Sequence, residues 1–152
     1  MSRQLTAVLM LIAYGLYIAV LWTFSIERVW IWRGMDLHAF AVDFGKSVRR
    51  VDIFQPALAV LSLLLAVGYV TTVGGTSRIL TVVAVVLMVV VFIGSVFVGV
   101  PMQKPFRFAE QGDVATDVDV ANVRERWTRF HLVRTVLSVV AFVLLVVAAV
   151  YP

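Results

Sequence analysis

Four long runs of apolar residues, nearly free of charged side chains, dominate this sequence. They cover residues 5–26, 54–73, 79–100 and 132–151, with Arg134 just inside the start of the last run. A helix needs about 20 mostly apolar residues to cross the hydrocarbon core of a bilayer. A small soluble core could not bury runs of this length, so each run predicts a membrane span.

Many residues in these runs are β-branched, as in 82–91, and in water such a composition favours strands. In lipid, however, an open strand edge leaves backbone amides unpaired, and these runs are too long and unbroken for barrel strands. We therefore predict an all-α integral membrane protein. Residues 1–152 are expected to form a single domain, a bundle of four transmembrane helices.

The composition excludes several classes of site. Hydrophobic residues make up 62% of the chain and charged residues 14%, whereas a soluble domain is about half apolar and a quarter charged. The absence of cysteine excludes a disulfide, a thiolate nucleophile and an iron–sulfur site. His38 and His131 are too few for a histidine-only metal cage. We expect no metal and no cofactor.

Basic residues are distributed unequally between the two sides of the predicted bundle. The loops 27–53 and 101–131 are long, whereas 74–78 is a tight turn. The long loops carry Arg28, Arg33, Lys46, Arg49, Arg50, Lys104, Arg107, Arg124, Arg126 and Arg129, and the opposite side carries only Arg3 and Arg78. Because basic loops stay in the cytoplasm, we predict a multi-pass protein of the inner or plasma membrane, with both long loops cytoplasmic and both termini outside. The net charge of +4 then suits anionic lipid headgroups and not nucleic acid.

The two long loops contain helical patterns of their own. In 36–51, apolar residues recur at near-helical spacing, at Leu37, Phe40, Ala41, Phe44, Val48 and Val51. This pattern predicts an amphipathic helix, which either lies on the membrane surface or caps the bundle. In the other loop, Asp119 is a candidate N-cap for a helix that runs from about Val120 into the fourth span.

Polar residues that align on one helix face indicate a candidate site. Trp127, His131, Arg134 and Ser138 follow one another at i, i+4, i+7 and i+11, which places them on one face of the fourth helix. Polar groups in lipid cost free energy unless they are paired or hydrated. With the polar faces turned inward, the bundle would enclose a cavity open to the cytoplasm, ringed by Glu27, Asp52, Gln55, Gln103, Trp127, His131 and Arg134.

A purely structural interpretation of the same residues stays open. Small and hydroxyl residues at helix interfaces commonly serve packing alone. Arg134 could extend to the lipid headgroups or pair with Asp52 or Glu27, and Trp127 could be an interfacial anchor. A histidine and an arginine one turn apart, aligned with a tryptophan, are nevertheless more than anchoring requires.

Three segments resemble a known membrane family. Residues 127–137, which include Trp127, His131, Arg134 and Thr135, resemble the closing signature of a family of small four-helix membrane proteins that includes the anthrone oxygenases. The signature is a tryptophan, then an asparagine or histidine, then arginine-threonine. Residues 100–103 resemble the family's valine-proline-leucine-asparagine element, with Gln103 at the asparagine position. Residues 40–56 resemble its amphipathic segment.

The resemblance implies an activity and roles for several residues. Anthrone oxygenases convert the activated methylene of a tricyclic aromatic to a quinone carbonyl, and are thought to need neither metal nor flavin. The resemblance implies that His131 is the base and that Arg134 stabilises the enolate oxygen. Substrate binding would fall to Gln103 and Gln55 by hydrogen bonding and to Trp127 by stacking. The other candidate substrate-binding residues are Ser138, Asp52 and Glu27.

Other functions remain open at the level of the sequence. The chain could be an accessory subunit of a larger membrane complex, or a protein that binds a lipid or hydrophobic small molecule without turnover. Transport is disfavoured because the middle of the predicted spans lacks a charged residue. An enzyme predicts a preformed cavity that exposes His131 and Arg134, whereas a subunit predicts a filled core with Arg134 paired to an acid.

Overall fold

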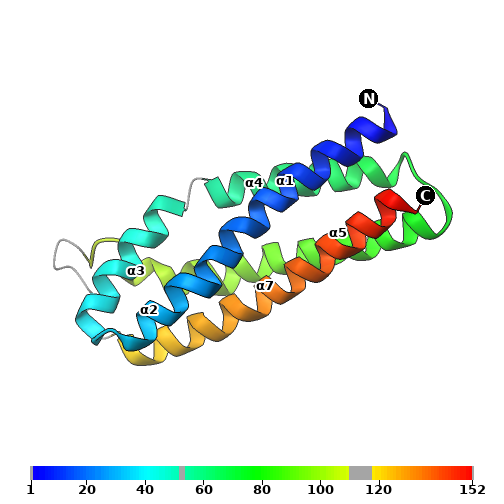
Figure 1. Ribbon diagram of the computed structural model, residues 1–152. Coiled ribbons are helices and arrows are strands. Elements are labelled where there is room, and N and C mark those ends of the chain that lie inside the picture. Colours follow the sequence, from blue (N-terminus) through cyan, green and yellow to red (C-terminus); the bar gives the residue numbers. More distant parts are fainter. Residues whose placement is uncertain (1, 52–53, 110–117, 152) are drawn as a thin grey trace.

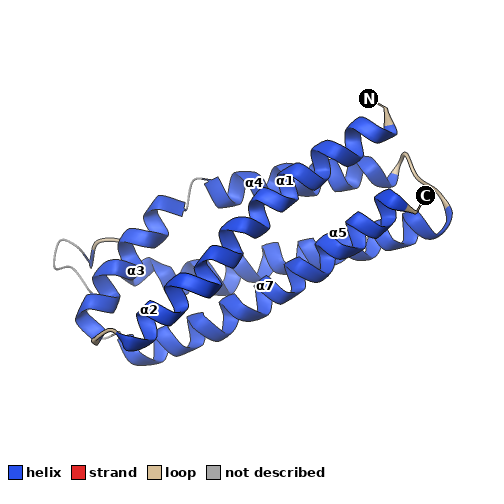
Figure 2. Cartoon of the chain, viewed as in Figure 1, coloured by secondary structure: helices blue, strands red, loops and turns tan. Residues whose placement is uncertain are grey.

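The computed structural model describes residues 2–51, 54–109 and 118–151, and the regular structure within these ranges is helical, without a strand (Figure 2). The first half of the chain begins with one continuous helical rod followed by two separate helices. These elements are α1 (Arg3–Thr23), the π-helical turn η1 (Phe24–Arg28), α2 (Val29–Gly34), α3 (Leu37–Val51) and α4 (Phe54–Val70).

The second half also begins with a helical rod that contains a π-helical turn, and it ends with one long helix. Its elements are α5 (Gly75–Gly94), the π-helical turn η2 (Ser95–Gly99), α6 (Val100–Gln103), the 3-10 turn η3 (Lys104–Phe106) and α7 (Val120–Val150). The Asp119 side chain accepts a hydrogen bond from the backbone amide of Asn122 at 3.0 Å. This cap confirms that the last helix begins at Val120, well before the apolar run.

The four long helices pack in a ring in which each has two neighbours. α1 packs against α4 and α7, and α5 packs against the same two helices. Both termini and the α4–α5 turn lie at one end of the molecule, and α2 and α3 lie at the other (Figure 1). We call the latter the α3 end. Polar residues near the ends of different helices are thereby brought to the same level.

Three helical stretches are long and apolar enough to cross a membrane: Arg3–Gly34, Gly75–Phe106 and Val120–Val150. They contain the predicted spans 5–26 and 79–100, and all of 132–151 except residue 151. The predicted span 54–73 is instead the 17-residue helix α4, which reaches span length only in combination with α3, across a bend of 43°. The described residues thus contain three candidate spans, or four when the bent pair is counted as one.

The outer surface of the ring is strongly apolar. Large side chains such as Leu16, Leu64, Val86 and Val136 are more than half exposed on different helices. Inside the ring, Met10, Leu21, Ala66 and Leu145, together with Tyr14, Tyr69, Met88 and Ala141, form a buried core. An apolar exterior on helices of this length is suited to a lipid bilayer and not to water.

The segment 36–51 forms α3, which caps the bundle at the α3 end. Its apolar side, Phe40, Ala41, Phe44 and Val48, is buried in a cluster with Val29, Trp32, Phe106 and Trp127. α3 also approaches η3 so closely that a Cβ on Gly45 would stand 2.0 Å from the carbonyl oxygen of Phe106. Leu37 remains exposed. The apolar face of α3 is otherwise covered by the protein itself.

Candidate functional site

The polar stripe of α7 faces the interior of the ring. Trp127, His131, Arg134 and Ser138 are exposed by 1%, 0%, 7% and 0% respectively. The prediction that these four residues share one inward face is therefore confirmed. Their surroundings differ, however, because each side chain meets a different neighbouring element.

His131 is fixed by hydrogen bonds at both ring nitrogens. Its Nε2 lies 3.1 Å from the carbonyl oxygen of Leu21, and its Nδ1 lies 3.2 Å from Nε and 3.0 Å from a terminal nitrogen of Arg134. A carbonyl only accepts and a guanidinium only donates. Nε2 therefore carries the ring proton, and Nδ1 is an acceptor occupied by Arg134.

Two aromatic rings, Trp127 and Phe24, pack against the imidazole of His131. The Trp127 indole stacks on it with 4.7 Å between centroids and 9° between planes, and Phe24 lies 6.1 Å away. Trp127 belongs to the aromatic cluster under α3, with Trp32 and Phe44 as edge-on neighbours. The orientation of His131 is thus linked to the packing of α3.

The two π-helical turns lie beside α7 and supply its partners. In η1, Ser25 donates to the carbonyl of Leu21 at 3.0 Å and lies 3.1 Å from the hydroxyl of Thr135. In η2, Ser95 donates to the carbonyl of Val91 at 2.8 Å and lies 3.5 Å from a terminal nitrogen of Arg134. Single π-helical turns within α-helices are frequent at functional sites.

Arg134 is a buried cation whose partners in the described part of the chain are neutral. They are His131, Ser95 and the Phe130 ring, whose centroid lies 5.6 Å from the guanidinium carbon. Within the described residues, no carboxylate forms an ion pair with Arg134; the ion pairs seen there join Arg28 to Asp43 and Arg129 to Glu125. Of the two acids predicted as partners, Glu27 does not pair with Arg134, and Asp52 lies outside the described residues.

A cavity of about 130 Å³ opens beside Arg134, between α1, α4 and the α5–α6 rod. We call it the Arg134 cavity. Its polar lining consists of Tyr17, Gln55, Ser95, Gln103 and Arg134, and its apolar lining of Pro56, Ala59, Phe92, Val96 and Val100. It combines one fixed cation, several hydrogen-bonding groups and an apolar wall, which is the usual make-up of a small-molecule site.

The predicted site residues separate into three groups. Gln55, Gln103 and Arg134 line the cavity, as the sequence predicted. Trp127, His131 and Ser138 are buried and do not line it, and Ser138 donates to the Arg134 carbonyl at 2.8 Å. Glu27 is exposed and does not line the cavity, and Asp52 lies outside the described residues.

Tyr17 and Ser95 line the cavity but were not among the predicted site residues. Both belong to polar stripes visible in the sequence, Tyr17 with Tyr14 and Ser95 with Gln103. Spacing alone did not separate them from packing residues, since hydroxyl groups are common at helix interfaces. The neighbouring Tyr14 hydroxyl is buried and forms no hydrogen bond with the described residues.

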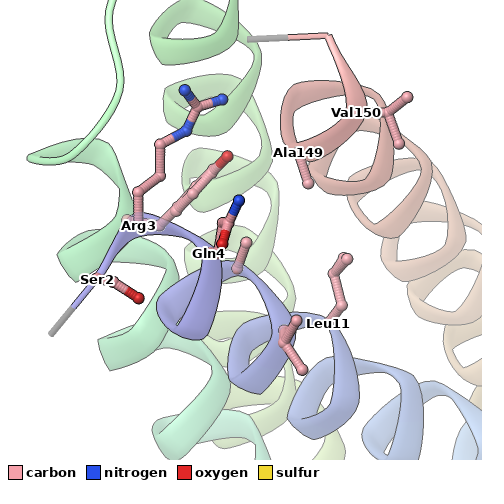
Figure 3. A pocket seen from close by; sticks show the side chains of 9 residues that line it. Ser2, Arg3, Gln4, Leu11, Ala149 and Val150 are labelled. Carbon is pink, nitrogen blue, oxygen red and sulfur yellow. The ribbon is translucent and has the colours of Figure 1, made fainter.

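A larger hollow of about 670 Å³ lies at the opposite end, near both termini (Figure 3). Its lining includes Ser2, Arg3 and Gln4 from the start of α1, and Ala149 and Val150 from the end of α7. None of the predicted site residues takes part in it. Size alone therefore does not identify the site, and the polar stripe of α7 points to the Arg134 cavity.

The comparison with protein families gives one match. The family model described as anthrone oxygenase matches residues 44–144. The chain belongs to the anthrone oxygenase family. The matched segment of this anthrone oxygenase-family protein extends from α3 into α7 and includes Gln55, Ser95, Gln103 and Arg134, whereas Tyr17 and Leu21 precede it. Among curated proteins and among solved structures, nothing matches.

Proposed function

We propose that this anthrone oxygenase-family protein oxygenates a hydrophobic aromatic substrate, of the anthrone or quinone-precursor type, in the Arg134 cavity and without a cofactor. The observation that carries the proposal is the buried guanidinium of Arg134 in the cavity wall, which forms no ion pair with any carboxylate among the described residues. A buried cation without a counter-charge is costly. An enolate or phenolate oxygen of the substrate would supply that charge.

The proposed reaction requires stabilisation of an anion. Loss of a proton from the activated methylene to water at the cavity mouth gives a carbanion whose charge lies largely on the ring-ketone oxygen. Arg134 would hold this oxygen by charge-assisted hydrogen bonds. Gln55, Gln103 and Tyr17 would position the substrate, and Phe92 would face its ring.

Dioxygen is the oxidant. The carbanion passes one electron to dioxygen, and the resulting radical and superoxide combine to form a carbon–oxygen bond. The peroxide takes up a proton, the oxygen–oxygen bond breaks, and loss of the second methylene proton leaves a carbonyl group and water. One methylene group and one dioxygen thus give one carbonyl and one water molecule, which balances atoms and electrons.

We also propose that α4, together with α3, completes a fourth span, so that both termini are extracytoplasmic and the α3 end is cytoplasmic. The excess of basic residues at the α3 end supports this orientation. The Arg134 cavity would then lie at the cytoplasmic side of the bilayer. A hydrophobic substrate could reach it from the lipid, and water could reach its polar lining.

The test is oxygen uptake by the purified protein in nanodiscs with anthrone, corrected for protein-free autoxidation. Removing one oxyanion-stabilising donor typically lowers kcat by about 10²–10³-fold. We expect that loss for Arg134→Gln and a smaller one for Arg134→Lys. Arg129→Gln is the matched control, because Arg129 is exposed and pairs with Glu125.

Three outcomes contradict the proposal. The first is an oxygen uptake that does not exceed protein-free autoxidation with any of the anthrones, naphthols and hydroquinones tested. Binding of anthrone without uptake would indicate a small-molecule-binding protein. Co-purification of a stoichiometric partner, again without uptake, would indicate a subunit of a membrane complex.

A further inference from the structure

We propose that His131 is a positioning residue for Arg134 and not the base of the reaction. This inference rests on the proposed function of the Arg134 cavity, since it assigns a role within that site. It departs from the role that sequence resemblance implies for His131. The geometry that carries it is the series of hydrogen bonds from the Leu21 carbonyl through the imidazole to the guanidinium.

A general base needs a free lone pair within reach of the substrate proton. The only lone pair of a neutral imidazole lies on its unprotonated nitrogen, which here is Nδ1. Two Arg134 nitrogens, at 3.2 and 3.0 Å, occupy it. The His131 side chain is also fully buried and is absent from the cavity wall. In this arrangement it has neither the lone pair nor the access that a base requires.

The same bonds determine where Arg134 points. His131 Nδ1 accepts from Nε and one terminal nitrogen of Arg134. The hydroxyl of Ser95, in η2, lies 3.5 Å from the other terminal nitrogen. The guanidinium is thereby held between α7 and η2 at the edge of the cavity. A cation fixed in advance stabilises a developing anion better than one that must reorient during the reaction.

The Leu21 carbonyl that fixes the tautomer lies near the end of α1, just before the π-helical turn η1. Hydrogen bonding in the first rod changes at this point, so that the amide of Val29 bonds to the carbonyl of Phe24, five residues earlier. At the junction, the Leu21 carbonyl accepts from two side chains, Ser25 and His131. The Leu21 carbonyl thus sets the proton on Nε2 and leaves Nδ1 to face Arg134.

Two conservative variants separate positioning from base catalysis. In His131→Asn the amide oxygen occupies the place of Nδ1, so the bond to Arg134 can persist. In His131→Gln the amide nitrogen approximates Nε2, so the bond to Leu21 can persist while Arg134 loses its acceptor. Small misplacements of catalytic groups can cost about 10²-fold. We expect kcat to fall less than about 10-fold in His131→Asn and about 10²-fold in His131→Gln.

The two variants are compared at equal folded fraction, measured by size-exclusion chromatography and thermal unfolding, so that a loss of folding is not counted as a loss of catalysis. An equally complete loss of activity in both variants would restore the base role and overturn the proposal. Full activity in both would overturn it as well, because Arg134 would then need no acceptor.

A spectroscopic test does not depend on turnover. The chain has only two histidines, so His38→Gln leaves His131 as the single imidazole, and His38 is exposed. With ¹⁵N-labelled histidine at neutral pH, we expect a protonated Nε2 and an unprotonated, hydrogen-bonded Nδ1. A proton on Nδ1 overturns the proposal, whereas absence of oxygen uptake with the expected spectrum overturns only the oxygenase function.

Discussion

Replacement of Gly45 by alanine tests whether α3 is held against the bundle by close backbone contact. The new Cβ would lie 2.0 Å from the carbonyl oxygen of Phe106, and Cβ atoms essentially never come closer than 3.0 Å to another heavy atom. Helix and carbonyl must therefore separate by at least 1.0 Å, the difference between these distances. Since the obstructing atom belongs to the backbone, no rotation of a side chain relieves the clash.

The cost follows from what α3 carries. Phe44, next to Gly45, packs against Trp32 and Trp127 with centroid distances of 5.3 and 5.1 Å. Overpacking of this kind costs about 1–3 kcal/mol, and replacing glycine in a helix returns about 0.5–1 kcal/mol. We expect a net loss of about 1–2 kcal/mol, or about 5 °C in Tm for a chain of this length.

The assay is thermal unfolding in detergent. Tryptophan fluorescence is the probe, because Trp32 and Trp127 lie in the disturbed cluster. Gly68→Ala is the matched control, since Gly68 is also helical but has no heavy atom within 4 Å of the added Cβ. That variant should be as stable as the wild type or slightly more stable. A Gly45→Ala protein with unchanged or raised Tm would refute the close packing of α3 on η3.

Two further predictions concern the α3 end and its orientation. Hydrogen bonds from the backbone amides of Ala39 and His38 lower the pKa of the Asp36 carboxyl below its ordinary value of 3.8. The stabilisation from this cap is thus complete above the ordinary pKa of 3.8 and is lost as the pH falls through the lowered pKa. Asp36→Asn should remove this part of the acid dependence of Tm. An unchanged acid dependence in that variant would contradict the prediction. Because the chain lacks cysteine, Thr71→Cys and His38→Cys can each carry a single thiol. In intact cells an impermeant reagent should label the former at once and the latter only after permeabilisation, whereas labelling of both from one side would contradict a crossing by α4.

The features predicted correctly from the sequence are those that depend on nearby residues. Three apolar runs became helices of span length, Asp119 capped α7, and 36–51 folded as the amphipathic helix α3. Hydropathy, capping and periodicity act within a few turns of chain, so they can be recognised without knowing the partners. The second run, 54–73, forms only the 17-residue helix α4, which ends at Val70.

The sequence by itself thus determined that the chain is a helical, lipid-facing protein with a polar stripe on its last helix. Only the tertiary structure decided which stripe residues reach the cavity. His131 and Arg134 share one face, yet His131 is bonded to the Leu21 carbonyl near the end of α1, whereas Arg134 lines the cavity. Which residue lines the cavity depends on where the Leu21 carbonyl and the Ser95 hydroxyl lie opposite α7. Residue spacing within one helix carries no information about how a neighbouring helix is rotated.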